Sequence, residues 1–504
     1  MAATSFLGPS AYGYGSTTQY HLLPFRFDRW SNGQVFLAND VGEFLFLPPD
    51  TFQAFIDHRL CPEDLQYFDL KAFHFLADDQ SSAHLDVLAS KYRTKKSFLD
   101  GFTKLHIFVT SLRCNQSCPY CQVSRQGAQA DPNVYDMRPE VLEHSVRLML
   151  ASPAPRVTME FQGGEAFINF DLLQEGVRLA KKLNVGVGKQ IDFVVCTNLT
   201  LLEDCHLDWC KSNNVLISTS LDGPAEVHDH NRPMGKGKPS HAVVTRNILR
   251  AQDALGKQAV SALMTTTLAS LSNGRAIVDE YLRLGLGSIF IRELNPFGFA
   301  SKSAVAMAYR TDEFIRFYVD MLDYIIAINR AGHTFSEAYA SLILTKILTP
   351  WPVGFVDLQS PSGAGLGVCV YNYDGDVYAS DESRMLAEGG DHAFRLGNVL
   401  KDDYESIFFG ETMQTIAAAA CNEALAGCSE CVYQSYCGAD PVRRYRTQGD
   451  IFGNRAGDAF CQKNISIIKH LLELLHKADD DPDLDRILWA WVRREDINHL
   501  RLPT

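Results

Sequence analysis

Six β-rich runs alternate with amphipathic helical patterns along the chain between Lys104 and Leu294. Strands that alternate with helices in this order form right-handed βαβ units on a parallel sheet. Six such units make about three quarters of a (β/α)8 barrel. We therefore predict an α/β fold with a partial (β/α)6 barrel of the TIM type, whose functional groups lie in the loops after the strands. The predicted strands are LHIFVT, RVTMEF, IDFVVCT, VLISTSL, SALMTTT and SIFIREL.

Three further regions flank the predicted barrel, which we assign to residues 101–337. Residues 1–100 form a small α+β module and a linker, because the strand-like runs QVFLAND and GEFLFL precede two helical segments and a polar stretch. We expect these helices at about 50–58 and 62–76, and the linker at 77–100. A Cys-rich domain follows at 338–470, and a helical tail at 471–504.

Composition and charge narrow the functional classes. The chain has 504 residues, of which 46% are hydrophobic and 21% charged, so it is long enough for several domains that each bury a core. Its net charge is −13 and it has no Lys/Arg-rich block, so a nucleic-acid partner is not expected. No signal sequence and no apolar stretch near the roughly 20 residues of a membrane span is present, and we expect a cytoplasmic protein.

The spacing of the first cysteine cluster predicts a metal site. Thirteen cysteines in a reducing compartment favour metal binding over disulfides. Cys114, Cys118 and Cys121 stand in the loop after the first predicted strand. Three thiolates can ligate a [4Fe–4S] cluster and leave one iron open, whereas a structural zinc ion would usually need a fourth ligand, and the next cysteine is Cys196.

Polar motifs also follow the next three predicted strands. The second strand leads into QGGEA, in which adjacent glycines allow a close backbone approach to a ligand and Glu165 can hold an ammonium group. The third leads into CTNLT, and the fourth into STSLDGP, where Ser220 and Asp222 can hydrogen-bond ribose and carboxylate groups. Arg232 in HDHNRP is either a carboxylate partner or a surface arginine.

The joint pattern resembles the radical S-adenosylmethionine (SAM) enzymes. CNQSCPYC with Tyr120 before the last cysteine resembles their CxxxCxxC motif, QGGEA their GGEP motif, and CTNLT their TNG motif with Leu199 in place of glycine. The resemblance implies that SAM chelates the open iron, and that its cleavage gives a 5′-deoxyadenosyl radical that abstracts hydrogen. It also implies these cofactor-binding residues: Gln162, Gly163, Gly164, Glu165, Thr197, Asn198, Ser220, Asp222 and Arg232.

The second cysteine cluster suits zinc or an iron–sulfur cluster when taken alone. Its spacing after such a barrel resembles the SPASM extension, whose seven cysteines hold two auxiliary clusters. Here Ser380 and Pro441 occupy two of the expected cysteine positions. We therefore predict one auxiliary [4Fe–4S] cluster, ligated by Cys428, Cys431, Cys437 and Cys461. Cys369 is then a remnant, or part of a divergent site with Asp374 or Ser380.

Two features point to a peptide substrate. Asp381 matches the position of a catalytic aspartate in the sulfatase-maturing relatives, where a carboxylate can accept a substrate proton, although a solvated turn aspartate is the simpler reading. The N-terminal module resembles the winged-helix-like RiPP recognition element, which adds a leader peptide as a strand, although a lid or packing domain would have the same outline.

Residues of about 20–465 resemble the radical SAM maturases of His-Xaa-Ser systems, of the HxsB type, through LLPFRF, CNQSCPYCQ, QGGEAF, YNYDGDVYASDESRML and CGADPVRRY. This resemblance implies a peptide with His-Xaa-Ser repeats, a companion radical SAM maturase, and a flavodoxin or ferredoxin as electron donor. The expected reaction is cross-linking or oxidation of the peptide. The alternatives are sulfatase-maturase-like oxidation of Ser or Cys, and a noncatalytic zinc-stabilised peptide-binding scaffold.

Overall fold

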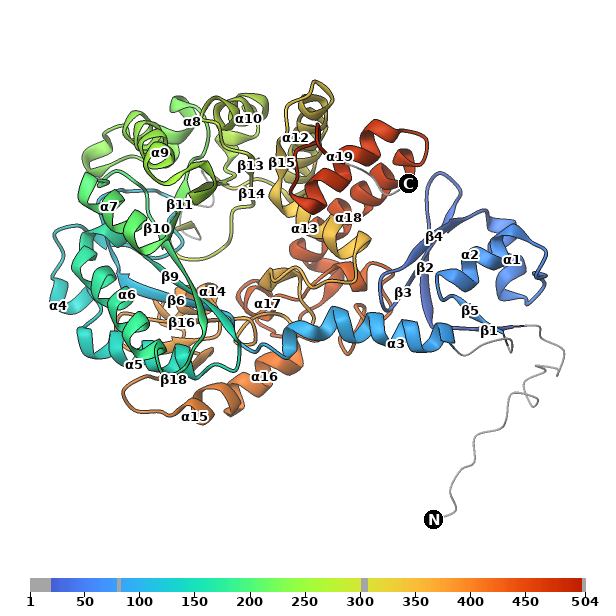
Figure 1. The fold of residues 1–504 in the computed structure, drawn as a ribbon, viewed down its shortest axis with the longest axis horizontal. Coiled ribbons are helices and arrows are strands. Elements are labelled where there is room, and N and C mark those ends of the chain that lie inside the picture. The colour runs from blue at the N-terminus through green and yellow to red at the C-terminus, as the bar shows by residue number, and fades with distance from the viewer. Residues whose placement is uncertain (1–19, 79–82, 301–306, 501–504) are drawn as a thin grey trace, which may run out of the picture. The chain divides into compact units, whose positions relative to one another are not determined.

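The computed structural model describes residues 20–78, 83–300 and 307–500 (Figure 1). The chain divides into two compact units. The first contains residues up to Ser97 together with 346–352 and 426–436, and the second contains the remainder. The first unit thus ends close to the predicted limit at residue 100. It also takes in two segments of the region 338–470, which the sequence analysis treats as one domain.

An antiparallel sheet with β3 at its centre forms the base of the first unit. All five residues of β3 are buried, and Leu37 joins a core with Phe52 and Phe55 of the following helix. The two strand-like runs and the two helices expected here are confirmed, and β2 is an additional strand. The elements are β1 (His21–Leu22), β2 (Phe25–Arg29), β3 (Val35–Asn39), β4 (Phe44–Leu47), α1 (Pro49–Ile56), α2 (Leu65–Ala72) and β5 (Leu76–Ala77).

The stretch expected as a linker contains a helix, α3 (Ala83–Lys96). None of its residues is buried, and three basic residues stand in its last turn. Residues 79–82 of the expected linker lie outside the described part of the chain. Several residues of α3 are half-buried, and Lys91 forms an ion pair with Glu43 of the same unit.

Six parallel strands of the second unit pair in chain order, as the βαβ pattern predicts. Each crossover helix returns the chain to the same edge, so successive strands become neighbours. In the described residues the sheet begins at β14 and continues past β6. The strands are β6 (Leu105–Ser111), β9 (Arg156–Gly163), β10 (Gln190–Cys196), β11 (Val215–Ser220), β12 (Val260–Thr265) and β14 (Ile291–Arg292).

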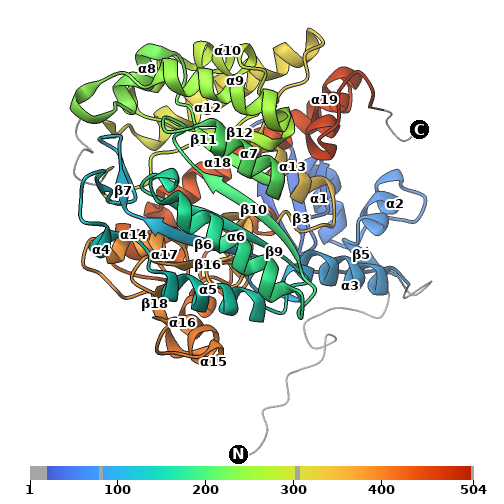
Figure 2. The same ribbon diagram turned by 60° about the vertical axis from the view of Figure 1, so that its left-hand side comes forward.

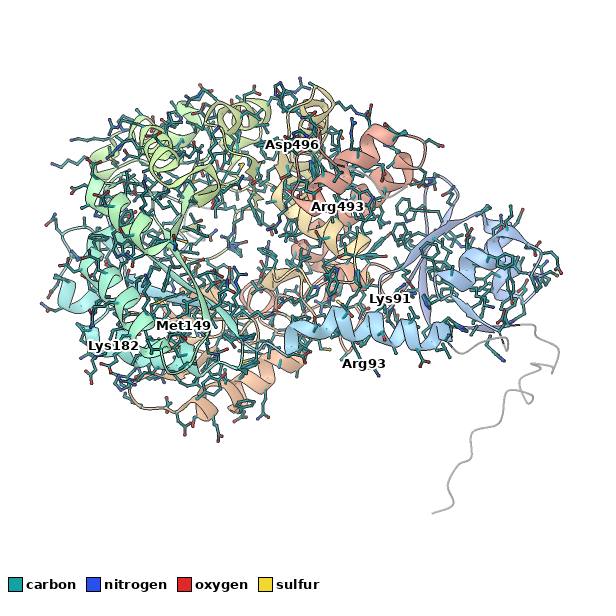
Figure 3. All side chains as sticks on the ribbon, in the orientation of Figure 1. Lys91, Arg93, Met149, Lys182, Arg493 and Asp496 are labelled. Carbon is teal, nitrogen blue, oxygen red and sulfur yellow. The ribbon has the colours of Figure 1, made fainter. Side chains whose placement is uncertain are left out.

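Amphipathic helices connect these strands and lie along the sheet (Figure 2). Met149 of α5 is fully buried, whereas Lys182 of α6 is exposed. Both side chains are labelled in Figure 3. One face of each helix therefore supplies the core and the other meets solvent. The connecting helices are α4 (Pro132–Tyr135), α5 (Pro139–Ala151), α6 (Phe170–Asn184), α7 (Asp204–Asn213), α8 (Ala225–Asn231), α9 (His241–Leu255) and α10 (Gly274–Arg283).

The sixth predicted strand is divided. Its first part, β13 (Ser288–Ile289), pairs with β15 (Ser336–Glu337), while β14 pairs with β12. The break occurs where the backbone N–H of Ile291 donates to the buried carboxylate of Glu337 at 3.0 Å. A side chain thus takes the place of a neighbouring strand at this point.

The Cys-rich region extends the barrel sheet, which its sequence does not predict. β16 (Val368–Tyr371) pairs in parallel with β6, and an antiparallel hairpin follows it. The hairpin strands are β17 (Asp376–Tyr378) and β18 (Arg395–Asn398). The remaining helices are α12 (Thr311–Arg330), α13 (Ala338–Leu348), α14 (Asp381–Ala387), α15 (Tyr404–Phe409), α16 (Glu411–Ala419), α17 (Pro441–Gln448), α18 (Ala459–Ala478) and α19 (Pro482–Arg493).

Candidate functional site

The strand-end motifs of the second unit meet around one cavity of about 210 Å³. Strands β6, β9, β10 and β11 run parallel, so the loops that follow them lie at the same end of the sheet. Predicted site residues that line the cavity are Cys114, Cys118, Cys121, Gln162, Gly163, Gly164, Thr197, Asn198, Ser220, Arg232 and Asp381. Glu165 and Asp222, two further candidates from the motifs after these strands, are buried and contact lining residues.

The three cysteine thiols of the first cluster face this cavity. Burial raises the pKa of Cys114 and raises that of Cys118 to about 12. Cys114 lies in the short strand β7 (Arg113–Cys114), which pairs with β8 (Gln126–Gly127), and its Sγ accepts from the Gln116 amide at 3.4 Å. The amide of Asn198 lies 3.8 Å from the same sulfur. Buried thiols ringed by N–H donors suit bound iron, because a metal stabilises the thiolate form.

The three thiols do not converge on one point, as the ligands of a single metal ion would. In the described residues no group of three or more His, Cys, Asp or Glu side chains converges as it would around one metal ion. In a [4Fe–4S] cluster each thiolate binds a different iron, so the three sulfurs need not meet at one point. The three thiols that line one cavity are therefore compatible with a cluster at Cys114, Cys118 and Cys121.

The two glycines after β9 pack against the chain that leads to Cys114. A Cβ atom on Gly163, whose φ is +141°, would stand 2.1 Å from the Ser111 carbonyl oxygen, and one on Gly164 would stand 2.3 Å from that of Arg113. The Gly164 amide donates to Ser111 O at 2.8 Å. The sequence analysis expects these glycines to approach a ligand closely. They also pack closely against backbone atoms, and this packing positions the cysteine loop.

Glu165 holds the next motif in place. Its carboxylate accepts hydrogen bonds from the Thr197 hydroxyl at 2.6 Å and from the backbone amides of Asn198 at 2.7 Å and Phe167 at 3.1 Å. Burial raises its pKa, while these hydrogen bonds oppose the rise. The structure therefore gives Glu165 a positioning role for the Thr197–Asn198 segment, and its expected contact with an ammonium group stays a prediction.

Asp222 and Arg232 form a buried ion pair with Nε–Oδ1 at 3.0 Å. The Tyr120 hydroxyl donates to Asp222 at 2.5 Å, and the Arg232 guanidinium lies 5.3 Å from the centre of the Tyr120 ring. Burial works against the charge of Arg232, but the Asp222 carboxylate outweighs it and the Arg232 pKa is raised. Arg232 is thus no surface arginine. Asp222 fixes it at the cavity wall, where its exposed edge can meet an anionic group.

Asp381 reaches the cavity from the first turn of α14. Its Oδ1 accepts from Arg384 Nε at 2.9 Å, and Arg384 itself is fully buried. The preceding Ser380 caps the helix, because its hydroxyl accepts from the Ser383 amide at 3.2 Å. Asp381 is therefore a cavity residue with a fixed orientation and not a solvated turn aspartate.

The positions expected to carry further auxiliary-cluster ligands have other roles here. Pro441 is the first residue of α17, and Asp374 accepts from the Asp376 amide at 3.0 Å in a tight turn. Cys369 is fully buried beside His106, with Sγ to Nδ1 at 3.3 Å, and burial raises its pKa to about 12. These contacts favour the reading of Cys369 as a remnant packed in the sheet.

The four cysteines of the predicted auxiliary cluster are half-buried. Cys428 and Cys431 belong to the first compact unit, and Cys437 and Cys461 to the second. Cys461 stands in the first turn of α18, and the Asn464 amide lies 3.6 Å from Cys437 Sγ. The ligand set stays a prediction.

The residues of the cavity wall that the sequence analysis missed include Cys196 and Arg292. Cys196 is the last residue of β10, and its pKa is raised well above normal by burial and by Glu160. Arg292 lies in the sixth strand run. Alternation along a barrel strand, which sends every second residue inward, is the signal that could have identified both.

Residues 108–268 match the family model of the Radical SAM superfamily. The chain contains a radical SAM domain. That segment includes the three cysteines of CNQSCPYC and the motifs after strands β9, β10 and β11. Proteins of this superfamily bind a [4Fe–4S] cluster together with SAM, and the residues expected to hold both line the cavity of this domain. When bound, this pair supplies hydrogen-atom abstraction, while the protein binds and orients the substrate.

Curated relatives match parts of this radical SAM enzyme. It is 33% identical over 138 residues to the serine-type anaerobic sulfatase-maturating enzyme of Bacteroides thetaiotaomicron, an alignment that covers 27% of this chain and 33% of that enzyme. The chain therefore spans about a third of that relative's length. It is 24% identical over 308 residues to the cysteine-type anaerobic sulfatase-maturating enzyme of Clostridium perfringens, which covers 58% and 77% of the two chains.

Solved structures share the fold. The structure of anSMEcpe with bound AdoMet superimposes with a TM-score of 0.61 at 20% identity and covers 75% of this chain and 99% of that one. Streptococcus suis SuiB bound to the precursor peptide SuiA gives a TM-score of 0.51 at 13% identity, with 88% and 100% covered. Separately, none of the helices in the described ranges is long and apolar enough to cross a membrane.

Proposed function

We propose that this radical SAM enzyme modifies a ribosomally made peptide by abstracting a hydrogen atom from one of its residues. Support comes from the proteins that share its fold, since SuiB is bound to the precursor peptide SuiA and anSMEcpe to AdoMet and the Cp18Cys peptide. The observation that carries the proposal is the common cavity. The three cysteines, residues of the motifs after β9, β10 and β11, and Asp381 all line it.

Asp381 is the proposed catalytic residue. Its carboxylate lines the cavity of the cysteines, and the Arg384 guanidinium, which donates to it at 2.9 Å, fixes its orientation. A fixed carboxylate next to the site of hydrogen abstraction can accept the proton that a substrate side chain releases on oxidation or cross-linking.

The proposed substrate is a peptide with His-Xaa-Ser repeats, as the motif resemblance implies. A companion radical SAM maturase and a flavodoxin or ferredoxin as electron donor belong to the same proposal, as does one auxiliary cluster held by the four C-terminal cysteines. We place the reaction in the cytoplasm, where thiol ligands stay reduced. The N-terminal unit is the proposed leader-peptide reader. Strands β2 and β4 lie at the edges of its described sheet, and an edge strand can accept a further strand.

Oxidation of a single Ser or Cys to an aldehyde is the second candidate, favoured by the two sulfatase-maturating relatives. Against it, Ser380 and Pro441 stand where a complete SPASM extension would carry cysteines, and both serve helix N-termini here. The zinc-stabilised scaffold is the least supported alternative, because the chain contains a radical SAM domain.

Mass spectrometry of the repeat peptide, after anaerobic reaction with the reconstituted enzyme, SAM and a reductant, tests the proposal. Cross-linking removes two hydrogen atoms and gives a product that a hydrazide does not label, whereas a formyl product is labelled. Asp381→Asn should still cleave SAM but should leave the peptide unchanged. If no 5′-deoxyadenosine forms and the peptide keeps its mass, the proposed function is wrong.

Iron content separates the cofactor alternatives. A [4Fe–4S] cluster holds about four irons, so the proposal requires about eight per chain. Replacing Cys114, Cys118 and Cys121 by alanine should leave about four irons per chain, those of the auxiliary cluster. Replacing Cys428 and Cys431 by alanine should also leave about four, those of the cluster at Cys114, Cys118 and Cys121. A protein that binds zinc alone and lacks absorption near 400 nm would end the enzyme reading.

A further inference from the structure

A second cavity of about 240 Å³ opens from the cavity of the cysteines. The two share four lining residues, and the second cavity continues under the sheet towards β16. The shared residues are Gln162, Leu263, Arg292 and Asp381. Whatever enters the second cavity therefore lies beside the place where hydrogen is abstracted. Its volume is smaller than the roughly 300 Å³ of the smallest drug-sized sites, which fits one amino-acid side chain.

Carboxylates from three elements line this second cavity. Glu160 projects from β9, Asp357 precedes β16, and Glu382 follows Asp381 on α14. The described lining holds a single cationic side chain, Arg292, whose guanidinium lies 3.4 Å from Glu382. Asp381 has its own partner in Arg384. One cationic side chain thus faces three acidic ones, so the lining of this cavity has more acidic than basic groups.

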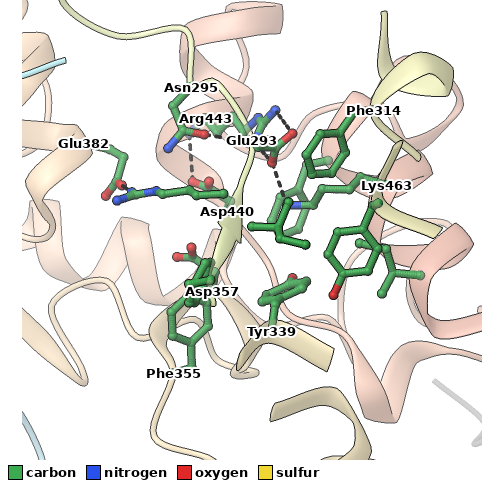
Figure 4. Close-up of a pocket in the computed structure, with 16 residues that line it drawn as sticks. Glu293, Asn295, Phe314, Tyr339, Phe355, Asp357, Glu382, Asp440, Arg443 and Lys463 are labelled. Atoms are coloured by element: carbon green, nitrogen blue, oxygen red, sulfur yellow. Dashed lines mark hydrogen bonds and ion pairs between the residues drawn. The ribbon is translucent and has the colours of Figure 1, made fainter. Parts of the chain in front are cut away.

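The charge of a neighbouring carboxylate, Glu293, is compensated by two cationic side chains. Glu293 binds Arg443 at 2.5 Å and Lys463 at 2.6 Å (Figure 4). Burial alone would raise its pKa, but these two cations lower it to about 2. In contrast, burial and nearby carboxylates raise the pKa of Glu382 to about 7, with Arg292 only partly opposing them.

The same contrast holds for the other carboxylates of the cavity. Burial raises the pKa of Glu160 to about 7, and Cys196 supplies its hydrogen bond. Burial also raises the pKa of Asp357, although Arg292, Lys463 and Arg443 act against it. Glu293 has two cationic partners. The acidic side chains of the second cavity have one cationic side chain, Arg292, in the same lining. A further positive charge in the cavity would remove this deficit.

Apart from Gln162 and Ser380, the remaining wall of the cavity is apolar. It is made by Leu105, Ile107, Leu263, Phe290, Phe355, Val356 and Val368. A hydrated metal ion gains nothing from such a wall, and the described carboxylates do not converge around a single ion. A side chain with an apolar stem and a cationic end satisfies both parts, because the stem packs on the wall and the end meets the carboxylates.

We infer that this acidic cavity receives one cationic side chain of the substrate peptide, a lysine, arginine or protonated histidine, and so selects the residue that is presented for modification. The inference rests on the proposed function, since it assumes a peptide substrate. Glu382, Asp357 and Glu160 are then specificity-determining residues. An acidic or neutral side chain of the same length would leave the carboxylates uncompensated and would bind more weakly.

Two small probes test this inference without turnover. N-acetyl-lysine methylamide and N-acetyl-norleucine methylamide have side chains of similar length, and only the first is charged. We would titrate each into the full-length, cluster-reconstituted enzyme with SAM bound and measure heat by calorimetry. The lysine probe should bind at least about tenfold more tightly than the norleucine probe. Equal affinity, or tighter binding of norleucine, would overturn the inference.

Variants of the lining carboxylates test whether these groups cause the preference for the lysine probe. Glu382→Gln and Asp357→Asn should each reduce the ratio of the two affinities, and the double variant should bring it near one. Glu495→Gln removes an exposed carboxylate at the far end of the chain and should leave the ratio unchanged. Iron content and circular dichroism confirm that each variant is folded. A lysine preference that persists in the double variant contradicts the inference.

The proposed function and the assignment of the acidic cavity can be disproved independently of each other. A lysine preference in an enzyme that leaves every peptide unmodified would count against the function alone, whereas peptide modification without a lysine preference would count against the cavity assignment alone. Arginine and histidine probes of the same design, titrated at pH 6 and 8, then identify which cation fits. Only the histidine probe should weaken as the pH rises, because its imidazole loses its proton in that range.

Discussion

The carboxylate of Glu165 accepts a hydrogen bond from the hydroxyl of Thr197 at 2.6 Å. Glu165 follows β9 and Thr197 follows β10, so this contact joins the ends of neighbouring strands. The Asn198 amide binds the other carboxylate oxygen at 2.7 Å, and the Asn198 side chain reaches Cys114. One buried acid thereby couples three of the predicted motifs.

Replacing Glu165 by alanine should therefore disturb cofactor binding and stability together. It leaves a buried hydroxyl and two buried backbone amides without their acceptor, at a cost of about 1–3 kcal/mol each in the free energy of unfolding. Urea denaturation should show this loss, and SAM affinity should fall, because Asn198 loses its support. Glu165→Gln keeps one acceptor oxygen and should lose less. An alanine variant with unchanged SAM affinity would show that Glu165 does not position the motif.

Gly163 is predicted to tolerate no side chain. An added Cβ would stand 2.1 Å from Ser111 O, which precedes the cysteine loop by only a few residues. Gly163→Ala should displace that loop and lower the iron content by about four per chain, the share of one cluster. Gly186→Ala is the matched control, since no heavy atom lies within 4 Å of its Cβ position. Full iron content in both variants would contradict the prediction.

Leu199 tests the balance of strain against packing. It has a φ of +58°, a conformation that costs a side-chain-bearing residue about 1–2 kcal/mol, and the related motif has glycine there. The side chain is also fully buried, and losing a buried leucine costs about 2–5 kcal/mol. Packing outweighs strain, so Leu199→Gly should lower the free energy of unfolding. A glycine variant as stable as the parent in a denaturant titration would show that the strain is larger.

Glu160 should make stability depend on pH. Its pKa in the folded chain is about 7, raised by burial and by Asp381 from the ordinary value of 4.5. Between these pH values the folded chain holds a proton that the unfolded chain has released. The contribution of Glu160 is therefore present at low pH and is lost as the pH rises towards 7, at up to about 1.4 kcal/mol per pH unit.

The neutral variant Glu160→Gln removes this dependence. The difference in stability between Glu160→Gln and the parent should widen in favour of the variant from pH 5.5 to 8. Thermal unfolding at several pH values, followed by circular dichroism, measures it. Cys196 and Asp381 face the same side chain and are unchanged in the variant. Parallel profiles for the two proteins would show that Glu160 titrates as an ordinary carboxylate.

Much of the cavity follows from the order of residues along the chain. Parallel βαβ units bring successive strand ends together, so motifs found after four predicted strands had to meet once the sheet formed. This local logic placed Cys114, Thr197 and Ser220 around one cavity. It also gave the strands and helices of the barrel, because their hydrophobic periods are short-range patterns.

Contacts between distant residues were not available from such patterns. Nothing in STSLDGP or HDHNRP indicates that Asp222 binds Arg232 and Tyr120 in a buried group. Asp381 was found from a motif, but its entry into the cavity depends on β16 pairing with β6, which brings α14 against the barrel. Strand pairing between segments more than 250 residues apart leaves no periodic signal in either one.

The sequence by itself therefore determined the barrel, the thiols that can hold a cluster and the general class of chemistry. Only the tertiary structure decided that Glu165 supports a loop, and that Glu160, Asp357 and Glu382 share a cavity next to the cysteines. The physical reason is that ligand chemistry depends on residue type and spacing. Electrostatic compensation depends instead on which charges from distant segments come within a few ångströms of each other, and folding alone sets that.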